Sequence, residues 1–544
     1  MLHNSRNPAN IRNPPIYAVN RYFLMFGRVP SSNALSCKRE RHFDLLTLAS
    51  IKYLGIESGY SFSRCEKGGM GTVLNIPDNV LMIINILERN GFEGYAVGGC
   101  VRDMVLGRRP EDWDITTSAK PRQIKALFRR TIDTGIEHGT VTVLIGGGAY
   151  EVTTYRVDGN YDDHRHPGTV TFTPSLTEDL RRRDFTMNAM AYNPTSGVVD
   201  KFEGMEDINR KLIRCVGDAR ERFEEDALRM LRAIRFAGQL QFGIEKKTFE
   251  AICEKAPTIV HVSAERVRTE LTKLLVSDGQ DRLLLARETG LSRYFLPELD
   301  AMLETEQKNP HHAYDVGHHA LEAVRHINRI CKERSEISAK AHVSLCYAAL
   351  LHDVAKPSCR TTDADGVDHF YNHNELGEKK AKGILRRLKF DNETISIVTR
   401  IIRYHDRRHE NCLVDGRYSE KGKRSMRRLV NRIGIDAMPL LFILQEADLL
   451  AQSKYMQEEK LKKLLAAQRC FQEICEAGDA VAVKDLAVNG RDLMEIGIKP
   501  GPELGRILQE LLEYVMEEPE KNEKKLLLNY VQNNILQNIS NQQR

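Results

Sequence analysis

Between residues 78 and 155 the apolar positions of the chain follow two different periods. From Asp78 to Asn90 they recur at helical spacing, and Gly91 ends this predicted helix in the usual place. Tyr95 to Val97 predicts a short strand, and the segments Thr140–Ile145 and Tyr150–Tyr155 predict two more, joined by a hairpin turn at three consecutive glycines. Helical and strand patterns therefore mix here, which predicts a small domain built on a mixed sheet.

After residue 215 the pattern becomes helical. Glu225 to Arg235 reads as one helix whose buried stripe consists of Ala227, Leu228, Leu231 and Ile234. Ser263 is a good N-cap for another helix, and Glu458 to Glu476 has the pattern of a charged amphipathic helix. The expected fold class is α+β, with a small mixed-sheet domain followed by helical domains.

The composition of the 544 residues is that of an ordinary globular protein, with 41% hydrophobic and 28% charged residues, and the length allows three or four domains. No apolar run approaches the roughly 20 residues of a membrane span, so no membrane partner is expected. The formal net charge of +5 permits RNA as a partner. The eleven cysteines contain no Cys-x-x-Cys pair, which argues against a disulfide framework or a zinc knuckle and favours reduced thiols in a cytoplasmic protein.

Residues 1–72 differ in composition from the rest of the chain. They contain seven Arg and three Lys against four acidic residues, and they show no sustained periodicity. A basic, acid-poor segment is typical of an organelle transit peptide. We favour a misassigned, largely disordered upstream extension, because Glu66-Lys67-Gly68-Gly69 can be encoded by a purine-rich tract of the kind that serves as a bacterial ribosome-binding site.

Candidate chemistry concentrates between Gly98 and Asp114. Gly98 and Gly99 follow a predicted strand and open a helix, so a phosphate could approach bare backbone N–H groups at the helix N-terminus. Asp112 and Asp114 are two residues apart, which on a strand directs both carboxylates to one face, while Trp113 turns into the core. Taken separately, a tight turn and a surface acidic pair would explain these residues. Together they predict a triphosphate seat beside a divalent metal site.

The order Gly-Gly-x-Val-Arg-Asp, then Leu106-Gly107-Arg108, then Asp-x-Asp resembles the signature of the class II nucleotidyltransferases. This family comprises the tRNA CCA-adding enzymes and the bacterial poly(A) polymerases. The resemblance implies that Asp112 and Asp114 are catalytic and hold Mg²⁺. It also implies that Gly99 and Arg102 bind the triphosphate.

Three further features lie in the same part of the chain. The segment Arg181–Ala189 matches the family motif Arg-Arg-Asp-Phe-Thr-x-Asn-Ala, and the resemblance places Arg183 on the nucleotide. The polar segment Arg156–His166 resembles the family's flexible loop, which acts in the switch from C to A addition, and an ordinary exposed loop is the alternative. Glu151 lies on a predicted strand, where it is either a third carboxylate of the site or a structural residue.

Asp226 and Arg229 stand three residues apart on a predicted helix, so a hydrogen-bond acceptor and a donor can face one base edge together. On the pattern alone, an intrahelical salt bridge is the simpler interpretation. Glu-Asp-x-x-Arg resembles the family's amino-acid template, which implies that these two residues read the base. Arg232 and Arg235 match further nucleotide-binding positions, although helical drift puts Arg235 roughly opposite Asp226. Glu265–Leu271 also resembles the family's neck, with packing and RNA backbone contact as its expected role.

A set of histidines and aspartates follows further along the chain: His319, His352, Asp353 and Asp448, with His373 and His405 as candidate outer ligands. Its order resembles an HD metal-dependent phosphohydrolase domain. Imidazole and carboxylate ligands together suit a transition metal such as Ni²⁺, Co²⁺ or Mn²⁺, which lowers the pKa of bound water. The alternative is an inactive helical scaffold for tRNA. Beyond it, Asn489–Pro502 resembles the family's element that holds the tRNA elbow, with Lys499 suited to a phosphate contact.

The resemblance covers about residues 73–540 and implies a tRNA nucleotidyltransferase that builds the 3'-terminal CCA from CTP and ATP. The alternatives are a poly(A) polymerase, an enzyme that adds only CC or only A, and, from another class, an HD phosphohydrolase whose head merely binds nucleotide or RNA. The oligomeric state stays open. The expected segments are the extension 1–72, the nucleotidyltransferase head 73–215, the neck 216–300 with the nucleotide-selecting helix, the HD body 301–455 and the tRNA-binding tail 456–544.

Overall fold

The computed structural model describes residues 74–159, 170–407, 413–414 and 417–536 of the chain. The described residues all belong to one compact unit of the chain. The expectations for residues 1–72 and for most of the loop 156–166 therefore lie outside the described residues.

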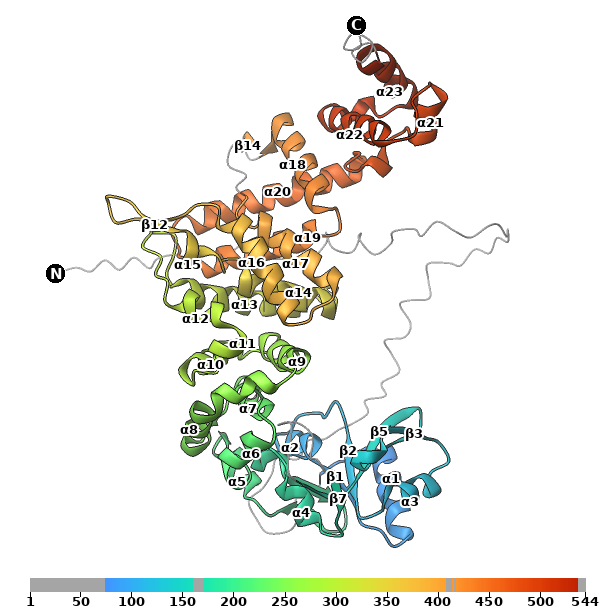
Figure 1. Cartoon of the computed structure of the whole chain (residues 1–544), viewed down its shortest axis with the longest axis vertical. Coiled ribbons are helices and arrows are strands. Elements are labelled where there is room, and N and C mark those ends of the chain that lie inside the picture. Colours follow the sequence, from blue (N-terminus) through green and yellow to red (C-terminus); the bar gives the residue numbers. More distant parts are fainter. Residues whose placement is uncertain (1–73, 160–169, 408–412, 415–416, 537–544) are drawn as a thin grey trace, which may run out of the picture. The chain divides into compact units, whose positions relative to one another are not determined.

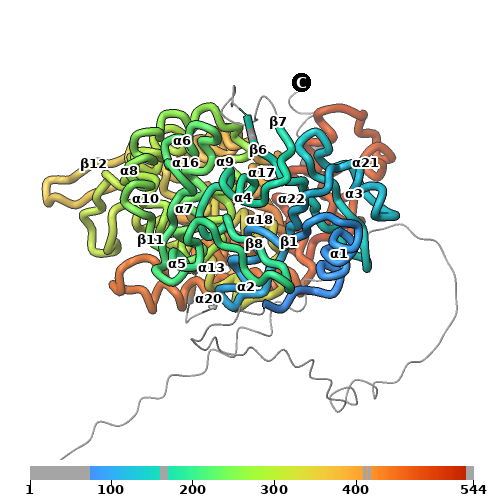
Figure 2. Tube along the Cα trace, turned by 90° about the horizontal axis from the view of Figure 1, so that it is seen from below, coloured from blue at the N-terminus to red at the C-terminus, as the bar shows by residue number. Residues whose placement is uncertain are grey.

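A seven-stranded mixed sheet forms the centre of the head (Figure 1). Its strands follow the order β3-β4-β5-β2-β1-β8-β9, in which β2 and β5 run parallel and the other neighbours run antiparallel. The strands are β1 Gly94–Val97, β2 Asp114–Thr117, β3 Thr131–Gly135, β4 Thr140–Ile145, β5 Gly148–Thr154, β8 Met190–Asn193 and β9 Gly197–Asp200. The chain therefore returns to the side of β1 only with β8, and Figure 2 shows these two strands next to each other.

The predicted helix and hairpin of the head agree with the structure. Helix α1 spans Asp78–Arg89 and buries Val80, Ile83, Ile84 and Leu87. The turn between β4 and β5 lies at Gly146 and Gly147, whose φ angles of 57° and 80° suit glycine. The remaining short elements of the head are α2 Gly99–Val105, α3 Pro121–Leu127, β6 Arg156–Asp158, β7 Val170–Phe172, α4 Leu176–Arg181, α5 Gly204–Asn209 and β10 Leu212–Ile213.

The neck contains the helices α6 Ala219–Glu225, α7 Leu228–Leu240, α8 Lys246–Lys255, α9 Ala264–Leu275, α10 Leu284–Glu288 and α11 Ser292–Phe295, and the short strand β11 Gly243–Ile244. The expectation of one continuous helix through residues 225–235 is wrong. Helix α6 ends before Asp226, whose extended backbone has φ −145° and ψ 102°. The Asp226 carboxylate instead accepts the backbone N–H of Leu228 at 3.1 Å, which satisfies a donor in the first turn of α7. The two helices are therefore joined at the residue that was expected to read the base.

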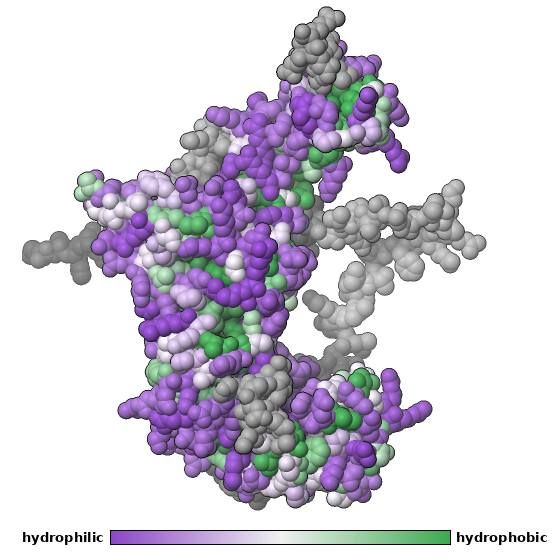
Figure 3. Space-filling model, in the orientation of Figure 1, coloured by the Kyte–Doolittle hydropathy of each residue, from purple (hydrophilic) through white to green (hydrophobic). Residues whose placement is uncertain are grey.

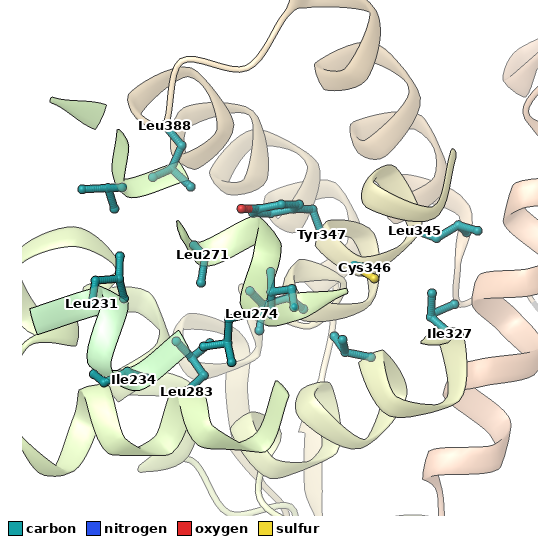
Figure 4. Packing of buried hydrophobic residues seen from close by; sticks show 14 of the residues in the cluster. Leu231, Ile234, Leu271, Leu274, Leu283, Ile327, Leu345, Cys346, Tyr347 and Leu388 are labelled. Carbon is teal, nitrogen blue, oxygen red and sulfur yellow. The ribbon is translucent and has the colours of Figure 1, made fainter. Parts of the chain in front are cut away.

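Helix α7 packs closely against the turn that follows α9. A Cβ atom added to Gly238 of α7 would stand 2.7 Å from the carbonyl oxygen of Gly279 and 2.5 Å from Cδ1 of Leu274. Apolar side chains of α7, α9 and the body share one buried cluster (Figure 4). Its members include Leu231 of α7, Leu274 of α9, and Leu345 and Tyr347 of the body. The absence of a side chain at position 238 thus permits the backbone contact on which the neck packs.

The body and tail are mainly helical. Their helices are α12 Pro297–Leu303, α13 Val316–Glu333, α14 Ala339–Leu351, α15 Lys356–Cys359, α16 His373–Arg387, α17 Asn392–Tyr404, α18 Glu420–Ile433, α19 Met438–Ala451, α20 Gln457–Ala477, α21 Gly490–Glu495, α22 Pro502–Glu517 and α23 Lys524–Tyr530. Two short hairpins pair β12 Arg360–Thr362 with β13 Asp368–Phe370, and β14 Leu413–Val414 with β15 Arg417–Tyr418. A mixed-sheet head followed by helices confirms the predicted α+β class.

Apolar side chains gather in the interior of these domains. One cluster extends from Ile76 to Val481, and a separate cluster between Ala480 and Val531 forms the core of the tail. Hydrophilic residues dominate the face drawn in Figure 3. None of the described helices combines the length and the apolar character that crossing a membrane requires.

Candidate active site

The two glycines at the start of α2 have different roles. Gly98 adopts φ 80° and ψ −127°, and its N–H donates to the carbonyl oxygen of Met190 at 3.1 Å. The expectation that Gly98 offers a bare N–H is therefore wrong, because this group closes the junction between β1 and β8. The first helical hydrogen bond of α2 runs from the Arg102 N–H to the Gly98 carbonyl, so the N–H of Gly99 lies ahead of the helical ladder. Gly99 remains the glycine that could face a phosphate.

Three acidic residues lie near the start of the parallel strand pair. Asp114 is the first residue of β2 and stands opposite Glu151 of β5, while Asp112 precedes it by two residues. Asp114 is exposed as a whole residue, yet partial burial of its carboxylate raises its pKa, an effect that Arg183 opposes and Asp112 reinforces. Burial also raises the pKa of Glu151, and the charges of Asp114 and Asp112 raise it further. The acids therefore repel one another, which favours the binding of a cation.

These carboxylates match the hard oxygen ligands that Mg²⁺ prefers. Among the described residues, the carboxylate oxygens of Asp112, Asp114 and Glu151 do not all lie within 4.8 Å of one another. A bound cation would therefore have to draw them together. Trp113, between the two aspartates, is partly buried against the core, as expected.

Arg183 lies directly beside the glycine turn. A Cβ atom at Gly98 would stand 3.0 Å from its Nη1 atom. Its Nη2 atom lies 3.3 Å from Oδ2 of Asp179, while Arg182 donates to Oδ1 of the same carboxylate at 3.0 and 2.7 Å. Although burial acts to raise the pKa of Asp179, Arg183 and Arg182 lower it, so the carboxylate stays ionised. Asp179 thus positions Arg183 beside Gly98. The sequence offered a sign of this role, because Asp179 precedes Arg182 and Arg183 by three and four residues, the spacing at which helical side chains are neighbours.

A chain of hydrogen bonds leads from α2 to the neck. Arg102 donates from Nη1 to Asn188 at 2.7 Å, and Asn188 donates to Oδ1 of Asp184 at 3.1 Å. Arg232 donates from Nε and Nη2 to Oδ2 of Asp184 at 2.9 and 2.8 Å. Burial acts to raise the pKa of Asp184, but Arg232 and the Asn188 hydrogen bond outweigh it and lower the pKa. The Arg102 and Arg232 guanidiniums both stand over the Phe236 ring, at 5.0 and 5.4 Å from its centroid.

The side chains of Asp226 and Arg229 do not pair with each other, although the Arg229 N–H donates to the Asp226 carbonyl oxygen at 3.0 Å. Asp226 accepts two hydrogen bonds from Arg266 of α9, at 3.2 and 2.7 Å. Arg229 donates to Glu225 at 2.7 Å and to the carbonyl oxygen of Arg182 at 3.0 Å. The alternative interpretation, a salt bridge between these two residues, is therefore wrong. Each member of the candidate base-reading pair is oriented by other residues. Arg266 was expected only to pack or to touch RNA.

Arg235 points into the protein. Its guanidinium pairs with Glu270, donates to Gln239 at 2.6 Å and stacks 3.8 Å from the Phe236 ring centroid. Arg235 is 6% exposed and Glu270 4%, so this ion pair is buried. The arrangement agrees with the helical drift that separates Arg235 from Asp226, and a nucleotide contact by Arg235 stays a prediction.

The HD-type residues come together inside the body. His319 Nε2 lies 2.9 Å from Oδ1 of Asp448 and 3.3 Å from Nε2 of His352. His352 Nε2 lies 3.2 Å from Oδ2 of Asp353. The outer candidates His373 and His405 lie 3.4 Å apart at their Nε2 atoms. The structure therefore gathers all six predicted ligand residues, and it adds Lys356, whose Nζ atom lies 2.7 Å from Oδ2 of Asp353.

The tail residue Lys499 is exposed in the turn between α21 and α22. The helix after it starts at Pro502, which suits the first helical turn because proline lacks an N–H. This position is compatible with the phosphate contact expected for Lys499.

Comparisons with known proteins place these features in a family. Three family models match the chain: the poly A polymerase head domain at residues 94–214, a segment of polymerase A described as an RNA- and SrmB-binding site at residues 241–303, and tRNA nucleotidyltransferase domain 2 at residues 368–531. The CCA-adding enzyme of Geobacillus thermodenitrificans is 53% identical over 220 residues, which are 40% of this chain and 54% of that protein. That of Lactiplantibacillus plantarum is 53% identical over 227 residues, 41% of this chain and 55% of that protein. These alignments span about half the length of the curated relatives.

A solved structure extends the likeness to most of the chain. The Bacillus stearothermophilus CCA-adding enzyme in complex with CTP superposes with a TM-score of 0.62 at 30% identity, and the match covers 85% of this chain and 98% of that one. A CCA-adding enzyme in complex with ATP shares the fold with a TM-score of 0.53 at 18% identity, over 83% of this chain and 94% of that one. The chain therefore belongs to the nucleotidyltransferase family that contains the CCA-adding enzymes.

Proposed function

We propose that this protein adds the 3'-terminal CCA to tRNA, using CTP and ATP as substrates. The observation that carries the proposal is the position of Asp112, Asp114 and Glu151 near Arg183, which itself lies beside the Gly98 turn. Its relatives include CCA-adding enzymes, one of them solved with CTP. A cytoplasmic location goes with tRNA as the proposed partner.

In the proposed reaction Asp112 and Asp114 hold divalent cations, Mg²⁺ in the first place. Such ions, when bound, favour attack of the tRNA 3'-hydroxyl on the α-phosphate and offset charge on the departing pyrophosphate. Arg183, Arg102 and the Gly99 N–H bind the triphosphate from the other side. Asp226 and Arg229 select the base, and the tail near Lys499 contacts the tRNA elbow.

Incubation with a tRNA that lacks CCA tests this function. Each NTP is supplied separately and then all together, and product lengths are read on a gel. Addition of C, C and A from CTP and ATP is expected. A long A tract would identify a poly(A) polymerase, addition that stops after CC or requires a CC end would identify a partial enzyme, and no extension would contradict the proposal.

Arg229→Ala should weaken discrimination among NTPs by about ten- to a hundredfold, because a lost base-edge contact is worth about 1–3 kcal/mol. Arg266→Ala should act in the same direction, since Arg266 orients Asp226 through two hydrogen bonds. The ratio of kcat/KM for CTP or ATP to that for UTP or GTP measures the effect. Arg220→Ala is the control, because Arg220 is an exposed residue of α6 that pairs with Glu254. Unchanged ratios in both variants would refute the template role.

A second activity, hydrolysis of phosphoesters in the body, is favoured by the gathering of imidazole and carboxylate groups at His319, His352, Asp353 and Asp448. We expect Ni²⁺, Co²⁺ or Mn²⁺ at this site, because nitrogen and oxygen ligands together suit these ions. A 2',3'-cyclic phosphate is a suitable test substrate.

His352→Ala and Asp353→Ala should abolish this hydrolysis and leave CCA addition intact, whereas Asp112→Ala should do the reverse. The reason is that the two sets of candidate ligands lie on separate elements of head and body. Hydrolysis of the cyclic phosphate and CCA addition are measured on the same preparations. If no metal supports hydrolysis in protein that still adds CCA, the residues of the body are structural.

A further inference from the structure

One buried aromatic ring lies among three arginines. Phe236 belongs to α7 and is only 4% exposed. The guanidinium carbons of Arg235, Arg102 and Arg232 stand 3.8, 5.0 and 5.4 Å from its ring centroid. Favourable contacts between a cation and a ring face occur roughly once per 70–80 residues in proteins. Three of them at a single ring therefore call for an explanation beyond ordinary packing.

The three arginines come from two parts of the chain. Arg102 belongs to α2 of the head, whereas Arg232 and Arg235 belong to α7 of the neck. The head contributes a further contact, because Phe185 meets the Phe236 ring edge to face, with centroids 5.9 Å apart and an interplanar angle of 85°. Edge-to-face pairs of aromatic rings are favourable in themselves. Phe236 is therefore a residue through which α7 of the neck contacts the head.

Carboxylates bind the edges of the same guanidiniums. The pairs are Arg102 with Asp103, Arg232 with Asp184 and Arg235 with Glu270. A guanidinium donates its N–H groups in its own plane, while its flat face can stack on an aromatic ring, so the two contacts do not compete. Burial lowers the pKa of Arg235, Glu270 opposes this, and the charge of Arg232 lowers it further, which shows that the arginines repel one another. A shared ring with a negative face attracts each of them and offsets this repulsion.

Arg102 is held on several sides and still has N–H groups to offer. It is 9% exposed, and it donates from Nη1 to Asn188 at 2.7 Å. Asp103 accepts from its Nε and Nη2 atoms at 3.0 and 2.9 Å, so three of its five N–H groups have partners among the described residues. Within this part of the chain one N–H group on Nη1 and one on Nη2 are left for a phosphate. Asp103 and Asn188 thus fix the edge of the guanidinium, and Phe236 supports its centre.

Helix α7 carries both the ring and a candidate base-reading residue. Arg229 precedes Phe236 by seven residues, which is about two turns, so the two side chains leave the same side of the helix. Arg229 is attached to the head as well, through its hydrogen bond to the carbonyl oxygen of Arg182 at 3.0 Å. Any displacement of α7 therefore moves the ring on which Arg102 rests.

We propose that Phe236 is a positioning residue for nucleotide addition, which holds Arg102 through its ring face and couples this arginine to the base-reading helix α7. This inference rests on the proposed function and adds to it a residue that acts through Arg102. A nucleotide whose base suits Asp226 and Arg229 leaves α7 in place, so that Arg102 keeps its support at the triphosphate. A mismatched base displaces the helix and withdraws this support, which adds to the discrimination given by the base contacts themselves.

Fluorinated phenylalanines incorporated at position 236 of the full-length protein test this role. One, two or three ring fluorines withdraw negative charge from the ring face step by step and change the volume little, so they weaken a cation contact without removing the packing. We expect kcat/KM for CTP and ATP to fall with each fluorine, by about tenfold in total. The inhibition constant of tripolyphosphate should rise in parallel, because this probe lacks a base and competes only for the triphosphate position. Differential scanning calorimetry checks that each protein is folded.

Phe242 is the matched control for the fluorine series. It is a phenylalanine of the neck with 3% exposure, and none of the described cations stands over its ring. Fluorination of Phe242 should leave kcat/KM unchanged. In Arg102→Gln protein, single-turnover addition should no longer depend on the fluorines at position 236, because the ring acts through that arginine. The value of kcat/KM for UTP should fall less than that for CTP, since a mismatched base already withdraws the support of Arg102.

The possible results separate this role from the proposed function. In protein that adds CCA, equal kcat/KM across the fluorine series, an equal fall with fluorinated Phe242, or an undiminished fluorine dependence in Arg102→Gln would overturn the role of Phe236 and leave the proposed function standing. Equal falls for CTP and UTP would overturn the coupling between Arg102 and α7. A parent protein that extends no tRNA would contradict the proposed function and this role with it.

Discussion

Asp114→Ala reduces nucleotide addition by at least about a thousandfold and leaves the protein folded. The reason is that partial burial and the charge of Asp112 already raise the pKa of Asp114, so its carboxylate is placed for a cation rather than for stability. Loss of a metal ligand in a two-metal reaction removes several kcal/mol of transition-state stabilisation, and about 4 kcal/mol corresponds to a thousandfold. Single-turnover addition of CMP to tRNA measures the loss, and Asp112→Ala should behave in the same way.

Glu111→Ala is the matched control for this result. Glu111 is an exposed acidic residue directly before Asp112, and it lies outside strand β2. Its removal therefore changes the local charge without removing a candidate ligand. Addition by Glu111→Ala should stay within about twofold of the parent, since exposed substitutions away from a site have small effects. Normal turnover by either aspartate variant would show that the cations are held elsewhere.

Gly238→Ala destabilises the neck by about 2–3 kcal/mol, because a methyl group cannot fit between α7 and the turn after α9. The added carbon would stand 2.7 Å from the Gly279 carbonyl oxygen, which is backbone and cannot rotate away. The two segments must separate, and Arg232 and Arg235 move with α7. Differential scanning calorimetry should show a lower transition temperature, with easier proteolysis of the neck.

Gly383→Ala is the matched control, because here the same substitution should stabilise the protein. Gly383 lies inside α16 and has open space where its Cβ would stand. Alanine has the higher helix propensity, so this variant should be stabilised by about 0.5–1 kcal/mol. If both variants shift the transition temperature in the same direction, the close contact at Gly238 does not determine the stability of the neck.

Local patterns were sufficient to predict much of the head. The alternation at Thr140–Ile145 gives the observed strand β4, and the apolar spacing after Asp78 gives α1. The order of the histidines and aspartates in the body was sufficient to predict that they lie close together. In each case the information lies in the spacing of neighbouring positions or in a motif.

The hydrogen-bond partners of the site residues could not be predicted in the same way. Asp226 lies 40 positions before Arg266, and nothing in helical periodicity distinguishes that arginine from the nearer Arg229. The break between α6 and α7 is also hidden, because the apolar stripe continues across Asp226 while the backbone does not. Gly98 uses its N–H for the sheet only because β8 returns beside β1, which depends on topology.

The place of β8 beside β1 has a consequence for synthesis of the chain. A ribosome delivers β1, the glycine turn and the Asp112 to Asp114 segment well before it delivers Met190–Asn193. Until that strand emerges, β1 has an unpaired edge and Gly98 lacks the Met190 carbonyl, while Arg183 and Asn188 arrive with the same late segment. A nascent chain that stalls before β8 therefore presents the acids on an open sheet, a state prone to strand pairing with other chains. Protection from aggregation and assembly of the candidate nucleotide site are reached in the same step of folding.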